Sequence, residues 1–177
     1  MAGEGPFLWL NEGAPPAGFR RVPAGGMCLS VFLFVRRGAE ILVGKYAPHE
    51  AWERLTGLDP ERVRKHGLGW TIPASHLKYG EDPRAAARRV AEDVLGLDAL
   101  ALGEPRVETE YADWARPSGS GWHYDVWFFV DAEVPAGNVV TRPPWFAELA
   151  WADPRALPEA AWARSHGDVA RRWLRGQ

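Results

Sequence analysis

The side chains best suited to chemistry lie in one stretch, residues 75–97. It contains carboxylates, basic groups and an imidazole, at His76, Lys78, Glu81, Arg88, Arg89, Glu92 and Asp93. Carboxylate oxygens bind hard cations such as Mg²⁺, and Lys and Arg bind phosphate oxygens. Imidazole and carboxylate groups can also accept a proton from water. This combination has the groups to bind a hard cation together with an anion, and the same residue types also occur on solvated surfaces.

A loop followed by a helix is expected to position these groups. Asp82 and Pro83 are the residue types that begin a helix, as N-cap and first helical residue. Gly96 is the type that ends one. We therefore predict a helix from about residue 82 to residue 95.

The apolar residues of this predicted helix recur at helical spacing. Ala87, Val90 and Val94 should therefore face the protein core. The charged residues should lie on the opposite side of the helix, namely Arg88, Arg89, Glu92 and Asp93.

Residues 75–97 resemble a Nudix box, whose pattern is Gly, five residues, Glu, seven residues, then Arg-Glu-apolar-x-Glu-Glu-x-Gly-apolar. Without gaps, Glu81 matches the first Glu, Arg89 matches the Arg, and Gly96-Leu97 matches the ending. The similarity extends over roughly residues 20–175. It implies an α/β protein of one domain, a Nudix-type α/β/α sandwich with a central mixed β-sheet.

The stretch departs from the Nudix pattern where carboxylates are needed. Ser75 stands where the box begins with Gly, Val90 stands where a Glu follows the Arg, and Asp93-Val94 replaces the Glu-Glu pair. Glu81 and Arg89, in contrast, match two residues that form a structural ion pair in the family. The resemblance thus implies a preserved loop and helix with an impaired or atypical metal site.

Two registers of the helix against the box stay open. The gap-free register leaves Asp93 as the one matching carboxylate of the Glu-Glu pair. A shift by one residue aligns Glu92 and Asp93 with that pair, but it requires one residue fewer in the loop and one more before Gly96. Loop lengths favour the first register, and apolar periodicity favours the second. A simpler hypothesis is that both carboxylates only form i,i+4 ion pairs with Arg88 and Arg89 on a solvated face.

The resemblance assigns roles to the charged residues of the box. The candidates are catalytic Glu92, Asp93 and Glu81, metal-binding Glu92 and Asp93, and substrate-binding Lys78, His76 and Arg89. Glu108 and Glu110 alternate along a predicted strand and therefore share one face of it. They could complete a metal site that faces the box helix, and the alternative is that they are exposed strand residues.

By resemblance, the protein would be a hydrolase of a nucleoside diphosphate linked to another group, with Mg²⁺ or Mn²⁺ polarising phosphate oxygens. The apolar residue after Arg89 and the ending Leu95-Gly96-Leu97 are similar to those of GDP-mannose mannosyl hydrolases. In the loop that supplies the base of those enzymes, Glu148 is the only carboxylate here. The alternative is a non-catalytic module without a metal that binds a nucleotide or a protein partner.

The chain as a whole limits the classes of function. Its 177 residues, 46% of them hydrophobic, suffice for one domain with a hydrophobic core. A net charge of −2 gives no general attraction to nucleic acid or anionic membranes. The lone Cys28 excludes an internal disulfide, and the sequence shows neither a signal peptide nor a membrane-spanning run. We expect a cytoplasmic protein that binds a nucleotide-type small molecule and that could form a homodimer.

We divide the chain into a Gly/Pro-rich N-terminal segment (1–19) and a Nudix domain (20–177), with an insertion at about 47–69. Outside the box, apolar runs and turn residues predict the remaining elements. The predicted strands are 27–35, 41–46, 70–72 (ended by Pro73), 104–114, 123–134 and 149–151, and the predicted helices are 59–66, with Asp59 as N-cap, and 158–175.

Overall fold

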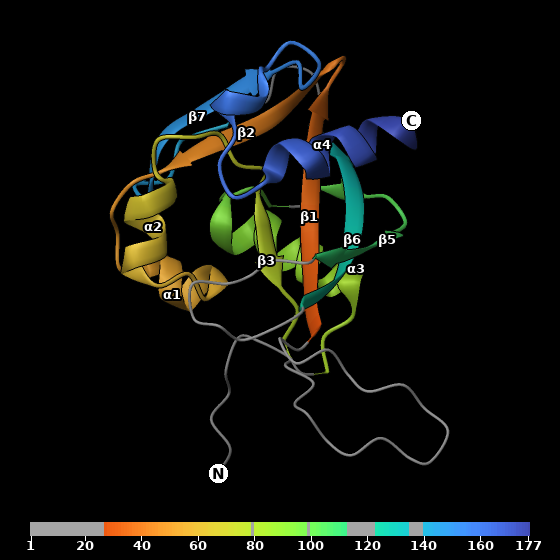
Figure 1. The fold of residues 1–177 in the computed structure, drawn as a ribbon, viewed down its shortest axis with the longest axis horizontal. Coiled ribbons are helices and arrows are strands. Elements are labelled where there is room, and N and C mark those ends of the chain that lie inside the picture. Colours follow the sequence, from red (N-terminus) through yellow and green to blue (C-terminus); the bar gives the residue numbers. More distant parts are fainter. Residues whose placement is uncertain (1–26, 79, 99, 113–122, 135–139) are drawn as a thin grey trace.

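The structure, a computed structural model, describes residues 27–78, 80–98, 100–112, 123–134 and 140–177 (Figure 1). The N-terminal segment 1–19 that the sequence suggests lies outside these residues.

A mixed sheet of seven strands forms the centre of the described part of the chain. Its strands are β1 (Met27–Arg37), β2 (Glu40–Tyr46), β3 (Ala74–His76), β4 (Ala101–Leu102), β5 (Arg106–Ala112), β6 (His123–Glu133) and β7 (Phe146–Ala152). The main path is β4-β6-β1-β2-β7, while β3 pairs with β1 and β5 pairs with β6. Strands β1 and β6 are parallel, and the other paired strands are antiparallel. The sheet is therefore mixed, as predicted.

The long strand β1 separates two hydrophobic clusters. Its residues alternate between the faces of the sheet, as the two-residue period of a strand requires. Val31, Leu33 and Val35 are completely buried in one cluster. Phe32 and Phe34, which are at most 6% exposed, lie in the other. An apolar run without polar alternation thus corresponds to a strand covered on both faces.

Helices cover both faces of this sheet. They are α1 (Ala51–Thr56), α2 (Pro60–His66), α3 (Pro83–Arg89) and α4 (His166–Arg175), with a π-helical turn at Val90–Val94 and a 3₁₀ turn at Glu159–Ala161. In Figure 1, α4 crosses in front of β1 and β6, and α3 lies behind them. Trp173 of α4 stacks on Phe34 with 4.6 Å between ring centroids, whereas Ala87 of α3 belongs to the opposite cluster. The predicted α/β/α sandwich is confirmed.

The box helix begins as predicted but is not α-helical to its end. The Asp82 side chain caps it by accepting hydrogen bonds from the amides of Arg84 (2.8 Å) and Ala85 (2.9 Å). After Arg89 the pattern widens, and the Leu95 amide donates to the Val90 carbonyl five residues earlier. Gly96, with φ of 66°, then ends the helix in the left-handed conformation that glycine tolerates.

The predicted strand at 70–72 is present only as isolated bridges, from Trp70 to Trp162 and from Thr71 to Gly44, and regular pairing begins after Pro73. The Thr71 amide makes a single bridge to Gly44, and the Ile72 amide donates to the His166 ring instead of to a strand. The Pro73 carbonyl accepts from the Leu33 amide, so the proline precedes a strand instead of ending one. Strand β3 follows it and pairs with β1.

The last helix is shorter than predicted, because it begins at His166 and not at Pro158. Arg164 and Ser165 both have positive φ, 54° and 58°. A right-handed helix cannot include such residues.

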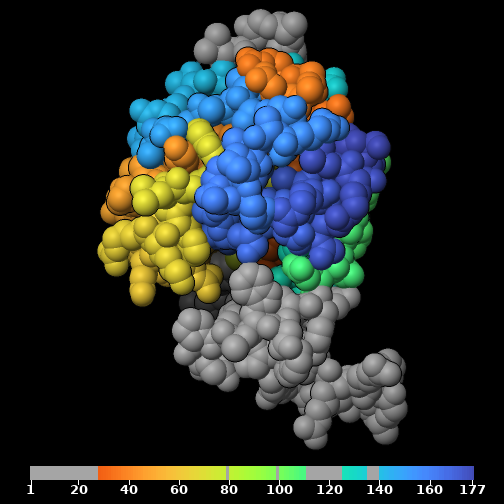
Figure 2. Space-filling view, turned by 45° about the horizontal axis from the view of Figure 1, so that its top comes forward, coloured from red at the N-terminus to blue at the C-terminus, as the bar shows by residue number. Residues whose placement is uncertain are grey.

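The insertion contains α1 in addition to the predicted helix, which is α2 and has Asp59 as its N-cap. Trp52 and Leu55 bury α1 in the same cluster as the box helix. Figure 2 shows the region of α2 beside the segment that leads into α4. The insertion is therefore part of the domain and not an appended loop.

Candidate functional site

Arg89 joins the box helix to the loop before it. Its Nε and Nη2 atoms donate to the two carboxylate oxygens of Glu81, each at 2.8 Å. Nη1 donates to Ser75 Oγ (3.0 Å) and the Leu55 carbonyl (3.3 Å), and Nη2 also donates to the His76 carbonyl (2.9 Å). The side chains of Arg89 and Glu81 are only 12% and 13% exposed. The predicted ion pair between them is confirmed.

The electrostatics of Glu81 follow from these contacts. Partial burial raises the pKa of its carboxyl group, but hydrogen bonds from Arg89 and from the Lys78 amide outweigh that effect. The pKa of Glu81 therefore lies below its ordinary value, and the carboxylate is charged at neutral pH. A charged carboxylate that accepts a hydrogen bond on each of its two oxygens holds the loop in place.

Ser75 has a role that the sequence did not indicate. Its hydroxyl accepts from Arg89 and lies 3.2 Å from the His76 carbonyl, and the side chain is buried. The serine at the position of the box glycine thus contributes a hydrogen bond to the network around the Arg89 guanidinium group. We call this network, which includes Glu81, the Arg89 brace. No sequence signal marks this, because the partner lies 14 residues away.

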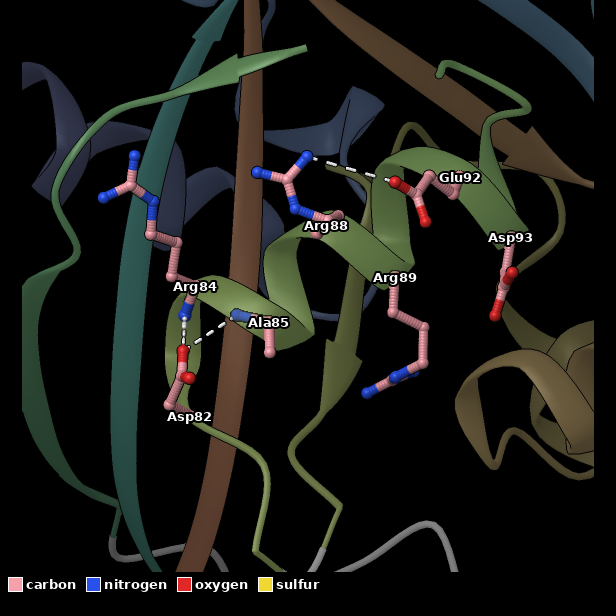
Figure 3. A pocket seen from close by; sticks show the side chains of 7 residues that line it. All are labelled: Asp82, Arg84, Ala85, Arg88, Arg89, Glu92 and Asp93. Atoms are coloured by element: carbon pink, nitrogen blue, oxygen red, sulfur yellow. Dashed lines mark hydrogen bonds and ion pairs between the residues drawn. The ribbon is translucent and has the colours of Figure 1, made fainter. Parts of the chain in front are cut away.

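A groove with a volume of about 390 Å³ runs along the outer side of the box helix. Its lining consists of Asp82, Arg84, Ala85, Arg88, Arg89, Glu92 and Asp93 (Figure 3). The groove therefore carries positive and negative charges, from guanidinium groups and carboxylates on one surface of the helix. Such a lining can bind phosphate oxygens and a divalent cation together.

The structure brings the candidate metal ligands Glu92 and Asp93 into this groove, and the other carboxylate of the lining, Asp82, is used to cap the start of the helix. The Glu92 carboxylate turns toward Arg88, with 4.0 Å between the nearest nitrogen and oxygen, and Asp93 points away from that pair (Figure 3). In the described part of the chain, no group of three or more His, Cys, Asp or Glu side chains is arranged to hold a metal ion. Two carboxylates suit a Mg²⁺ ion that takes its other ligands from water and substrate phosphate.

The valines that occupy Glu positions of the box point into the core. Val90 and Val94 are 0% and 1% exposed. This agrees with the apolar periodicity, whereas the Glu81–Arg89 pair agrees with the gap-free alignment. Arg89 was predicted on the solvated side, but it is largely buried against the loop because its bonding partners lie there.

The remaining loop candidates lie close to the Arg89 brace. His76 belongs to β3, and its carbonyl accepts from Arg89. The Lys78 amide donates to Glu81 at 2.9 Å, and the Lys78 residue is exposed. The structure therefore gathers Glu81, Arg89 and the backbone of His76 and Lys78 at one place, while His76 also lines a small cavity beside β3 and Glu92 and Asp93 line the groove.

The idea that Glu108 and Glu110 complete a metal site opposite the box helix is wrong. Glu110 accepts a hydrogen bond from Arg172 of α4 at 3.0 Å, and Glu108 pairs with Arg106 at 2.9 Å. Both glutamates lie level with β6 residues of the α4 face, so the sheet separates them from α3. The alternation along β5 predicted a shared face but not which one.

A small cavity lies beside β3, between residues of both hydrophobic clusters. It has a volume of about 20 Å³, and it is lined by Ser30, Phe32, Thr56, Leu58, Ala74, Ser75, His76, Arg164 and His166. A cavity of this size holds about one water molecule. Burial keeps the pKa of His166 well below its ordinary value, and the nearby Arg164 charge lowers it further. The ring is neutral, and its Nδ1 accepts from the Ile72 amide at 2.8 Å.

Solved structures with this arrangement are numerous but distant in sequence. The MutT protein of Methanosarcina mazei Go1 has 14% identity and a TM-score of 0.57, with 85% of this chain and 94% of that chain covered. DR0079 of Deinococcus radiodurans has 16% identity and a TM-score of 0.55, covering 90% and 87%. The E. coli dihydroneopterin triphosphate pyrophosphohydrolase has 15% identity and a TM-score of 0.52, covering 85% and 96%. At these identities the likeness establishes the fold alone.

A comparison with curated proteins gives no match. Among the described residues, no helix combines the length and the apolar character needed to cross a bilayer. At the family level, the chain matches the NUDIX domain over residues 26–173, which include the sheet, the Glu81–Arg89 brace and the groove. This protein is thus a member of the Nudix family.

Proposed function

We propose that this protein binds a nucleoside diphosphate linked to another group and hydrolyses it slowly with the help of a divalent cation. The observation that carries the proposal is the lining of the groove, where Glu92 and Asp93 share one surface with arginine side chains. Carboxylates suit the cation, and guanidinium groups suit the phosphate oxygens.

Glu92 and Asp93 are the proposed metal ligands and catalytic carboxylates. Mg²⁺ or Mn²⁺ bound by them would polarise the phosphate oxygens. We expect slow turnover because Val90 and Val94, at carboxylate positions of the box, are buried and offer no ligand. Fewer protein ligands leave the cation less firmly oriented, and catalysis depends on that orientation.

The loop residues complete the proposed site. His76 and Lys78 would contact the diphosphate or the group linked to it. Glu81 and Arg89 would act by holding the loop, because their charged atoms already bond to each other at 2.8 Å. Their contribution to substrate binding would therefore be the position of the loop relative to the box helix.

The substrate class is supported by resemblance. The box ending is similar to that of GDP-mannose mannosyl hydrolases, and one similar structure is named as a pyrophosphohydrolase of dihydroneopterin triphosphate. A nucleotide sugar is therefore the first substrate to test, followed by ADP-ribose and a dinucleoside polyphosphate.

The test compares the wild-type protein with the double variant Glu92→Gln/Asp93→Asn in Mg²⁺ and in Mn²⁺. We expect turnover of one of these substrates by the wild type and at least a tenfold loss in the double variant. Both substituted residues are exposed, so the fold should persist, which circular dichroism can check. Equal rates for the two proteins would exclude hydrolysis by this site.

A second candidate function is a non-catalytic module that binds a nucleotide. The observation that favours it is the lack of a third metal-binding side chain among the described residues. Under this alternative, the wild type binds nucleotides without turnover above the double variant. Calorimetry alongside the activity assay separates the two functions.

A further inference from the structure

Two arginines of the groove lie one helical turn apart. Arg84 and Arg88 are at i,i+4 spacing on α3, which places their Cβ atoms about 5–6 Å apart. Figure 3 shows both guanidinium groups on the same side of the helix. The adjacent phosphates of a diphosphate are within reach of two groups placed in this way.

Both guanidinium groups are accessible to a ligand. Their side chains are 49% and 48% exposed, in contrast to 12% for Arg89. The contact between Arg88 and Glu92, at 4.0 Å, is too long for a hydrogen bond and leaves the donors of Arg88 available.

The existing partners of Arg84 do not prevent such binding. One nitrogen donates to Glu104 at 2.9 Å and another to the Leu102 carbonyl at 3.0 Å. The Glu104 side chain is 86% exposed, and a solvated pair of this kind contributes little free energy. A phosphate group can therefore replace Glu104 as the partner of Arg84, while the bond to the backbone continues to orient the guanidinium group.

We infer that Arg84 and Arg88 bind the diphosphate directly, so that the groove takes up a diphosphate without a metal ion. This inference rests on the proposed function, in which the diphosphate lies in the same groove. Guanidinium groups suit it because they donate paired N–H groups to phosphate oxygens and stay charged at all relevant pH values. The cation is then needed for hydrolysis and not for capture.

Glu92 works against this metal-free binding. Its carboxylate repels the diphosphate and attracts Arg88, whose guanidinium lies 4.0 Å away. A bound cation would reverse the effect, because Glu92 is then a ligand. The same residue should therefore weaken binding without metal and strengthen binding with metal.

The experiment is calorimetry with inorganic pyrophosphate as the probe, in EDTA and in Mg²⁺. We expect binding in EDTA that weakens about tenfold in Arg88→Gln and in Arg84→Gln, as loss of a charged hydrogen bond implies. The control is Arg62→Gln on α2, whose side chain is 50% exposed and also lies near a carboxylate. It should bind like the wild type to within about twofold.

The variant Glu92→Gln gives the sharper result, because the sign of its effect depends on the metal. We expect tighter pyrophosphate binding in EDTA and weaker binding in Mg²⁺. Absence of wild-type binding in EDTA, or an equal loss in Arg62→Gln and Arg88→Gln, would overturn the inference.

Failure of this inference is distinguishable from failure of the proposed function. Binding only with Mg²⁺, together with hydrolysis, contradicts the inference and leaves the proposed function intact. Binding in EDTA without any hydrolysis in Mg²⁺ supports the inference and contradicts catalysis.

Discussion

At the scale of single residues, the box is organised around one buried guanidinium group. Arg89 bonds to Glu81, to Ser75 and to two backbone carbonyls, which fixes the loop on the helix. Arg88, the next residue, is half-exposed and faces the groove. Two adjacent residues of one type thus have different environments because successive helix positions point in different directions.

Ser75→Ala should lower the free energy of unfolding by about 1 kcal/mol, the usual contribution of one hydrogen bond. The substitution removes the hydroxyl that accepts from Arg89 Nη1 at 3.0 Å in a buried position. Urea unfolding followed by fluorescence measures the change. Thr141→Ala, at an exposed position, is the control and should leave stability unchanged. Equal stability of the Ser75 variant and the wild type would contradict the proposed brace.

At the scale of elements, the end of the box helix decides where its carboxylates lie. The π-helical turn at Val90–Val94 directs the valines inward and leaves Glu92 and Asp93 at the surface. The turn ends in Gly96, whose amide donates to the Glu92 carbonyl at 3.1 Å. The backbone of Glu92 therefore depends on a residue outside the groove.

Gly96→Ala should destabilise the protein by about 1 kcal/mol, because a β-carbon disfavours the left-handed conformation. Steric contact adds nothing, since no atom lies within 4 Å of the position of the new Cβ. Thermal unfolding can measure the loss. Gly96→Asn should lose less than the alanine variant, as asparagine tolerates this conformation better. The reverse order would show that the positive φ is not the cause.

At the scale of the whole molecule, the loop before α4 closes the sandwich beside β3. His166 at the start of α4 accepts a hydrogen bond from Ile72, 94 residues earlier in the chain. The same ring packs edge-on against Phe32 of β1, with 5.3 Å between centroids. The buried His166 ring therefore connects the last helix to strand β1 and to the segment that precedes the box.

The stability of the protein should fall as the pH is lowered below about 6.5, the ordinary pKa of histidine. The pKa of His166 is lower in the folded protein than in the unfolded chain, so the unfolded chain binds the proton first. One such group contributes a slope of up to about 1.4 kcal/mol per pH unit. Urea unfolding between pH 7 and 5 should give a flatter dependence for His166→Asn. Identical slopes for the two proteins would contradict the assignment.

Local signals in the sequence determined several of the elements and the presence of the box, but not α1, β3 or the start of α4. Apolar runs marked β1 and β6, and the pairs Asp59-Pro60 and Asp82-Pro83 marked the starts of α2 and α3. The structural ion pair between Glu81 and Arg89 was also predicted from the sequence. These features were predictable because they depend on residues close together in the chain, where spacing translates directly into position.

Only the tertiary structure decided how those elements serve a site. It placed Glu110 beside Arg172 on the α4 face, and it placed Arg84 and Arg88 in one groove with Glu92 and Asp93. Sequence spacing does not specify which face of a sheet a strand presents to a particular helix, because long-range packing sets that choice. It also does not specify whether an arginine is buried with five acceptors or open to a ligand. For this protein, those choices separate the buried Arg89 from the solvent-accessible Arg84 and Arg88.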